Sequence, residues 1–203
     1  SALINISGSG AKTLSRRTLI NSYTLTHTGT SFTHSNGAIM INQTGAAINL
    51  AGNNSGFSFG TGAKPRIKNY GLIAKTAGTG STIDIVLENY DARVETQTTS
   101  LTFSDTTKWF NSTDTLHTGT SNSFTTLAHT FDSNSRLVGT GSVSFTSGSM
   151  AFGGIYDIGA VSTFSGSAVS IAGSGGSLLK LGDSVSVTGG TINISTPQRI
   201  TIR

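Results

Sequence analysis

Apolar and polar residues alternate with a period of two along most of the chain. Short alternating runs occupy residues 46–50, 82–87, 142–146, 169–172 and 191–195. Successive side chains of a β-strand point to opposite faces, so this period predicts strands, and the helical period of 3.6 is nearly absent. Gly, Asn and Ser separate the runs and suit tight turns. The pattern predicts an all-β chain, arranged as a sandwich, a barrel or a β-solenoid.

An asparagine follows a short apolar run four times in the first ninety residues. These residues are Asn21, Asn42, Asn69 and Asn89, and they are separated by 21, 27 and 20 residues. A period near twenty is typical of a chain that coils on itself, here in about eight to nine turns. Equivalent residues of successive turns lie about 4.8 Å apart. We therefore expect the four side chains to stack as a structural amide ladder at a corner, bonded to one another and to the backbone.

Several stretches resemble a repeat of bacterial extracellular β-solenoid proteins, the adhesin-like surface proteins similar to filamentous haemagglutinin. Residues 67–78 and 80–85, IKNYGLIAKTAG and GSTIDI, resemble the pattern Asn-x-Gly-x-Ile, Gly-Gly and Thr-x-Ile, and residues 42–52, 88–96, 99–103 and 137–145 resemble further turns. The resemblance spans about residues 15–195 and implies a right-handed parallel β-helix on a secreted surface protein. The chain departs from the pattern at Asp91, which replaces the repeat Gly, and in its C-terminal half, which lacks the Asn.

Composition and charge argue against a disordered chain, a nucleic-acid-binding protein and a membrane-spanning protein. Only 11% of the residues are charged, but ten Phe and many β-branched residues argue against disorder. The net charge of +4 comes from scattered residues without a basic face, so we expect no nucleic-acid partner. The chain has no cysteine, and no stretch approaches the eighteen apolar residues of a membrane span. We expect an extracellular or cell-surface location for a mature secreted protein or a fragment of a longer one.

Acidic residues are densest in one short segment. They are Asp84, Glu88, Asp91 and Glu95. Glycosidases use two carboxylates about 5–9 Å apart, and residues of equal strand parity can meet on the outer wall. Lys75 and Arg93 stand nearby, so we interpret the segment as a solvated outer face.

Histidines and aromatic residues are the remaining candidates for metal binding or ligand binding. His27, His34, His117 and His129 lack the spacing of a zinc site, and we expect them at the surface. A platform for stacking on a glycan could consist of Trp109 and Phe110 with Tyr70 and Tyr90. Trp109, beside Lys108, is the best candidate among them. We expect no catalytic, cofactor-binding or metal-binding residues and no enzymatic activity.

Residues 1–203 are interpreted as a single β-solenoid domain with about 20-residue turns and an irregular turn or projecting loop near 104–135. The favoured function is a structural module of an adhesin, a surface protein or a self-assembling filament. Residues 1–8 and 198–203 alternate cleanly, so their open strand edges predict end-to-end or strand-exchange contacts between copies. Two alternatives stay open: a β-helix that binds or cleaves polysaccharide, like a phage tail-spike module, and a β-sandwich pilin or capsid-type subunit. A cell-surface glycan is the other candidate partner.

Overall fold

The computed structural model describes residues 3–110, 116–125, 127–171, 179–180, 182–194 and 200–201. These residues form three parallel sheets, named A, B and C here, in which hydrogen-bonded neighbours are three strands apart in chain order. Each coil of the chain therefore gives one strand to each sheet. Partners in register, such as Thr102 and Ser123, are 21 residues apart. The expectation of an all-β parallel β-solenoid with turns of about twenty residues is confirmed.

The strands are short, and most contain four residues. Sheet A contains β1 (Leu3–Ile6), β4 (Thr24–His27), β7 (Ala47–Leu50), β10 (Leu72–Lys75), β13 (Arg93–Thr96), β16 (Leu116–Thr118), β19 (Arg136–Gly139), β22 (Ile155–Ile158), β25 (Leu179–Lys180) and β28 (Ile200–Thr201). Sheet B contains β2 (Lys12–Ser15), β5 (Phe32–Ser35), β8 (Phe57–Phe59), β11 (Ser81–Ile83), β14 (Ser100–Phe103), β17 (Ser121–Phe124), β20 (Ser142–Phe145), β23 (Val161–Phe164) and β26 (Ser184–Val187). Sheet C contains β3 (Thr18–Asn21), β6 (Ile39–Asn42), β9 (Arg66–Asn69), β12 (Val86–Tyr90), β15 (Thr107–Phe110), β18 (Ala128–Phe131), β21 (Ser149–Phe152), β24 (Ser167–Ile171) and β27 (Gly190–Ile194).

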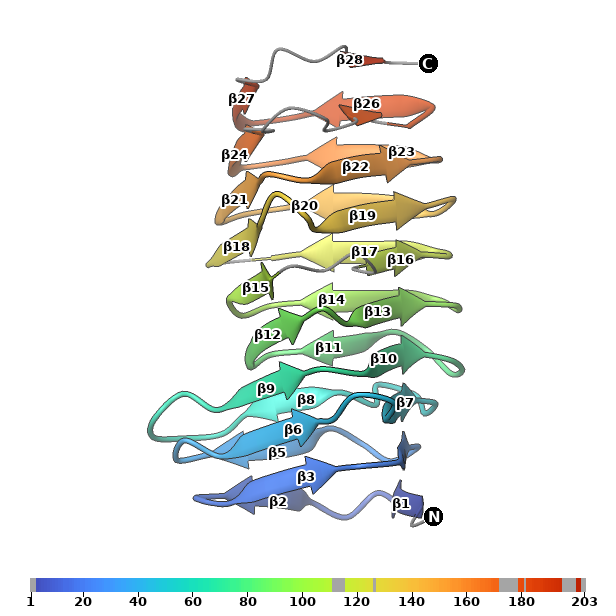
Figure 1. Ribbon diagram of the computed structural model, residues 1–203, viewed down its shortest axis with the longest axis vertical. Helices are drawn as coiled ribbons and strands as arrows, with labels where there is room; N and C mark the ends of the chain where they lie inside the picture. The colour runs from blue at the N-terminus through green and yellow to red at the C-terminus, as the bar shows by residue number, and fades with distance from the viewer. Residues whose placement is uncertain are drawn as a thin grey trace.

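The coil rises from the N-terminus to the C-terminus along one axis, and the two termini lie at opposite ends of the stack (Figure 1). Strands β19 and β22 run to the right nearer the viewer, and the paler strands β20 and β23 run to the left behind them (Figure 1). A chain that rises in this sense is right-handed, as parallel crossover connections almost always are.

Side chains alternate between the interior of the coil and its outer wall. The pattern half-buried, buried, half-buried, buried recurs in strands of all three sheets, for example in β7, β14 and β6. The interior holds one continuous cluster of apolar side chains that runs the length of the described stack. Stability therefore comes from contacts between consecutive coils.

Phenylalanines in sheet B show how the interior is packed. Phe103, Phe124, Phe145 and Phe164 are register partners on β14, β17, β20 and β23. Their ring centroids lie 4.9, 4.9 and 5.5 Å apart with interplanar angles of 17°, 13° and 8°. These spacings are close to the distance between neighbouring strands, so the backbone register itself stacks the rings. The sequence carried this signal in Phe residues spaced 21, 21 and 19 apart.

The structure differs from two predictions about where strands lie. The alternating run 82–87 is two strands, because the chain turns a corner between β11 and β12 while Ile83, Ile85 and Leu87 all stay in the core. The segment 104–135 contains the regular strands β15, β16, β17 and β18, each paired in register, so most of it is not an irregular loop. Residues 111–115 and 126 of this segment lie outside the described residues.

The ring stack generates the first prediction. Replacing Phe124 with Ala removes a fully buried ring that contacts rings above and below it, and we expect the free energy of unfolding to fall by about 3–5 kcal/mol. Urea unfolding measures this change. The matched control is Ser123→Ala on the outer wall of the same strand, which should change stability by less than about 0.5 kcal/mol. Equal effects of the two substitutions would contradict the stacked core.

Candidate functional site

The four predicted asparagines lie at one corner of the solenoid, at equivalent positions of β3, β6, β9 and β12. Each side-chain amide donates to the next along the axis. The Nδ2 to Oδ1 distances are 2.8 Å from Asn21 to Asn42, 2.7 Å from Asn42 to Asn69 and 2.6 Å from Asn69 to Asn89. All four side chains are buried. The structure thus brings the four residues together as one continuous amide ladder.

The ladder also holds the corner backbone. The same Nδ2 groups donate to carbonyl oxygens where the chain enters sheet A, from Asn21 to Ala47 O at 2.9 Å and from Asn42 to Leu72 O at 3.0 Å. Asn89 donates to Ala92 O at 2.6 Å. A buried amide with these partners is satisfied without any ligand. The asparagines therefore act as structural residues that fix the turn from sheet C to sheet A.

Trp109 continues this row, and its predicted role in glycan stacking is wrong. It pairs in register with Asn89 and is only 1% exposed. Its ring stacks on Phe131 at 5.1 Å, and its Nε1 donates to Thr107 Oγ1 at 2.9 Å. Strand alternation explains the error, because Trp109 points inward and its neighbour Phe110 points outward.

A second aromatic ladder stands on the outer wall of sheet C. It consists of Tyr70, Tyr90 and Phe110, with centroids 5.0 and 4.9 Å apart and interplanar angles of 13°. Tyr70 and Phe110, at its two ends, are 36% and 37% exposed. Each ring directly follows a residue of the inner row, so opposite strand parity places it outside. The aromatic group proposed from the sequence is thus divided, since Tyr70, Tyr90 and Phe110 stack on the outer wall and Trp109 lies inside.

The four acidic residues do not converge on one site. Glu88 lies on β12 of sheet C and accepts from Arg66 Nη1 at 3.0 Å. Glu95 lies on β13 of sheet A, 3.3 Å from Arg93. Asp84 and Asp91 lie at two different corners, before and after β12. Of the two pairs of equal strand parity, Asp91 and Glu95 line one hollow at the corner between sheets C and A, and neither Asp84 nor Glu88 lines it.

Several basic side chains predicted at the surface lie in the interior. Lys75 is completely buried on β10, and its Nζ donates to Gly52 O at 2.9 Å and Ala77 O at 2.6 Å. Burial lowers the pKa of Lys75. His27, His34 and His129 are also buried, and the side chain of His117 lies outside the described residues. The surface expectation failed because these residues occupy inward positions of their strands.

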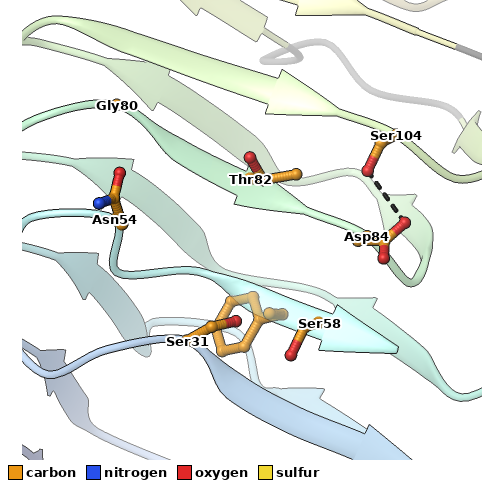
Figure 2. Close-up of a pocket in the computed structure, with 8 residues that line it drawn as sticks. Ser31, Asn54, Ser58, Gly80, Thr82, Asp84 and Ser104 are labelled. Atoms are coloured by element: carbon orange, nitrogen blue, oxygen red, sulfur yellow. Dashed lines mark hydrogen bonds between the residues drawn. The ribbon is translucent and has the colours of Figure 1, made fainter. Parts of the chain in front are cut away.

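One outer hollow lies on sheet B and has a volume of about 390 Å³. Figure 2 shows Asn54 at one end and Asp84 with Ser104 at the other. Ser104 Oγ donates to Asp84 Oδ1 at 3.0 Å, and Ser58 and Thr82 add hydroxyl groups. Activation of a serine needs a base that takes its proton, usually an imidazole, and no histidine lines this hollow. Its lining can hydrogen-bond a polar ligand, and its serine–carboxylate pair, Ser104 with Asp84, has no imidazole beside it among the lining residues.

Two further hollows lie elsewhere. One of about 220 Å³, on the outer face of sheet C, is lined mainly by small side chains around Met150 and Val169. The other, of about 380 Å³, lies at the corner between sheets C and A and includes Tyr70, Arg93 and Glu95. Across the described part of the chain, no three His, Cys, Asp or Glu side chains are placed to hold a metal ion. The same residues contain no helix of the length and apolarity that a membrane span requires.

Comparison with known proteins adds no functional assignment. No protein family matches the chain, and no curated protein or solved structure matches it.

The amide ladder generates a prediction. Replacing Asn69 with Ala breaks two ladder bonds and leaves the Nδ2 of Asn42 and the Oδ1 of Asn89 without their ladder partner. We expect a loss of about 1–3 kcal/mol in the free energy of unfolding, since each of the two hydrogen bonds lost contributes about 0.5–1.5 kcal/mol net. The matched control is Asn21→Ala at the end of the ladder, which breaks one such bond and should cost about half as much. Urea unfolding of both variants tests the ladder, and equal losses would contradict it.

Buried histidine generates a prediction for pH. His34 is fully buried, its Nδ1 lies 3.0 Å from Phe32 O, its Nε2 has no partner, and burial lowers its pKa from 6.5 to about 4. Between these two values the unfolded chain binds a proton that the folded chain does not, so stability falls as the pH falls. The loss reaches about 3 kcal/mol at pH 4.

Thermal unfolding between pH 8 and pH 4 measures this effect. His34→Leu, which copies Leu14 of the preceding coil, should reduce the pH dependence, and the lowered pKa of His27 accounts for part of the remainder. An unchanged pH profile in this variant would show that His34 does not carry the effect.

Proposed function

We propose that this chain is a non-catalytic structural module of an extracellular surface protein, adhesin or filament. The observation that carries the proposal is the set of edge strands at the two ends of the described stack. Strands β1, β2 and β3 are the edge strands of the three sheets at one end, and β28, β26 and β27 are the edge strands at the other. On its outer side, each of these strands has no strand partner among the described residues, so its backbone N–H and C=O groups are available there. A second copy on the same axis would pair with these groups.

The N-terminal end also exposes the apolar interior. Ile4, Ile6, Leu14 and Leu19 pack on the core but are only partly buried, whereas their counterparts in inner coils are fully buried. Among the described residues, the Oδ1 atom of Asn21 is buried without a hydrogen-bond partner, and Asn21 lies on β3, the first strand of sheet C. Stacking another coil on this end would cover the apolar side chains and pair the strand edges.

The C-terminal end is similar where it is described. Val185 on β26 and Ile192 on β27 pack against the core and are partly buried. Because the termini lie at opposite ends of one axis, head-to-tail stacking leaves a further open end on each copy and continues into a filament (Figure 1). Residues 1–2, 198–199 and 202–203 of the predicted contact segments lie outside the described residues.

The extracellular setting is supported by the resemblance of residues 67–85 to repeats of adhesin-like surface proteins. A β-sandwich pilin or capsid subunit does not fit a chain whose described strand pairs are all parallel. The polysaccharide-binding alternative has one specific observation in its favour, the corner hollow beside Tyr70.

Self-association is the testable consequence. We expect the intact chain to form filaments or oligomers at high concentration, visible by negative-stain imaging and sedimentation velocity. Deleting residues 1–8 or 198–203 should reduce assembly. Ile4→Lys places a charge at the open end of the core and should also reduce it, since an uncompensated charge is costly to bury. The matched control Thr13→Lys adds the same charge on the exposed outer wall of that coil and should assemble normally.

Two results would contradict the proposal. One is an intact chain that stays monomeric at high concentration, or truncated chains that assemble equally well. The other is cleavage of a bacterial polysaccharide that disappears in a variant with both Glu88→Gln and Glu95→Gln, because that result would make the module an enzyme.

A further inference from the structure

The corner between sheets C and A carries an open hollow of about 380 Å³, called the Tyr70 hollow here. It is lined by Gly45, Ala46, Ala47, Tyr70, Gly71, Leu72, Asp91, Ala92, Arg93 and Glu95. These residues come from the same corner of three consecutive coils. The volume lies in the range typical of small-molecule sites.

Two features of the sequence make the hollow. Four residues, 43–46, connect β6 to β7, whereas only two residues, 70–71, connect β9 to β10 in the next coil. The longer connection lies directly against Gly71, where an added Cβ would come within 2.3 Å of Ala46 O. In register, Ala47 pairs with Leu72 and Leu72 with Arg93, so side-chain size increases along the axis. The small residues leave space that Leu72 and Arg93 border.

Tyr70 supplies an aromatic surface with one covered face. One face of its ring stacks on Tyr90 at 5.0 Å, as part of the outer ladder. In the preceding coil the position after the asparagine is Gln43, which is exposed and is not aromatic. Tyr70 therefore ends the ladder and is 36% exposed. An amphipathic ring held in place by stacking can receive the apolar side of a ligand.

Charged side chains border the same space. Arg93 Nη2 lies 3.3 Å from Glu95 Oε1, and the two side chains are 36% and 23% exposed. The Nε of Arg93 is buried and has no hydrogen-bond partner in the described part of the chain. Asp91 is exposed and takes a left-handed conformation with φ of 45°. Fixed carboxylate acceptors and guanidinium donors at one rim suit a ligand with several adjacent hydroxyl groups.

We propose that the Tyr70 hollow binds a sugar residue of a neutral or amino-sugar-containing glycan. A pyranose ring has an apolar C–H face for Tyr70 and equatorial hydroxyl groups for Asp91, Arg93 and Glu95. Two carboxylates and one guanidinium leave the site with a net charge of −1, which disfavours uronic-acid and sulfated glycans. The hollow is open at the surface, so an internal residue of a longer chain can enter it. The module then both stacks and holds a glycan.

Glycan binding is independent of end-to-end stacking, because the hollow lies on the side of coils that have neighbours above and below. Saturation-transfer difference NMR tests it on the full chain, since this method reads the free ligand and works for monomers and assemblies alike. The probes are the methyl glycosides of glucose, galactose, mannose and N-acetylglucosamine, with methyl glucuronide as the anionic comparison. We expect saturable transfer to at least one of the four, weaker transfer to the glucuronide, and recovery of every glycoside unchanged.

Tyr70→Ala should weaken binding by about threefold to tenfold, as expected for loss of an aromatic contact. Ala47→Leu copies the residue found in register in the next coil and should fill the hollow and reduce binding to a similar extent. The matched control is Phe110→Ala, which removes the other end of the same aromatic ladder but does not line the hollow, and it should stay within twofold of the unchanged protein. Thermal unfolding confirms that each variant folds.

Three outcomes would overturn the proposal: no transfer to any of the four glycosides, Tyr70→Ala binding as well as the unchanged protein, or Phe110→Ala losing as much as Tyr70→Ala. A chain that binds a glycoside but never assembles would overturn the structural proposal alone. A chain that assembles without binding would overturn this one alone.

Discussion

The spacing of parallel strands, about 4.8 Å, is the constraint on which the rest of this structure depends. Each side chain must pack against, or hydrogen-bond to, its register partner in the next coil at that distance. Flat rings meet the condition by stacking, as Phe103 and Phe124 do with centroids 4.9 Å apart. Amides meet it by donating to the next amide, as Asn42 does to Asn69 at 2.7 Å. Both solutions join one coil to the next without help from distant parts of the chain, so the fold can extend one coil at a time.

One interior row uses both solutions. Asparagines occupy it through β12, and Trp109, Phe131 and Phe152 occupy it afterwards. Ile171 and Ile194 continue the row in register, so the position accepts amide, aromatic and aliphatic residues. The two halves differ in their corner backbone, because the amides pair carbonyl oxygens such as Leu72 O and the rings cannot. A buried amide ladder can be followed by a ring stack, because each residue of the row contacts only its register partners in the coils before and after it.

The sequence predicts the fold better than it predicts the orientation of single residues. Period-two alternation and the spacing of Asn21, Asn42, Asn69 and Asn89 were enough for a parallel solenoid with turns of about twenty residues. Inward or outward direction was predicted wrongly for Trp109, Lys75 and His34. Within a strand, alternate residues reliably point inward and outward. After each corner, the position of the first inward-pointing residue has to be determined anew. Corner lengths differ between coils, for example four residues before β7 and two before β10. The sequence alone therefore does not show which residues of the next strand point inward.

Variation in corner length can also give a repeated fold a binding site that its other coils lack. Residues within the sheets are held in register by partners on both sides, so a change there must suit two neighbouring coils. A corner has fewer such partners, and lengthening it by two residues at 43–46 leaves the stack intact, since Tyr70 N still bonds Asn42 O and Leu72 N bonds Ala46 O. The inserted residues are small and exposed in part, and the hollow beside Tyr70 forms around them. In this chain the sheets supply a rigid axis, and the departures from the repeat supply the sites at which a ligand can be distinguished from solvent.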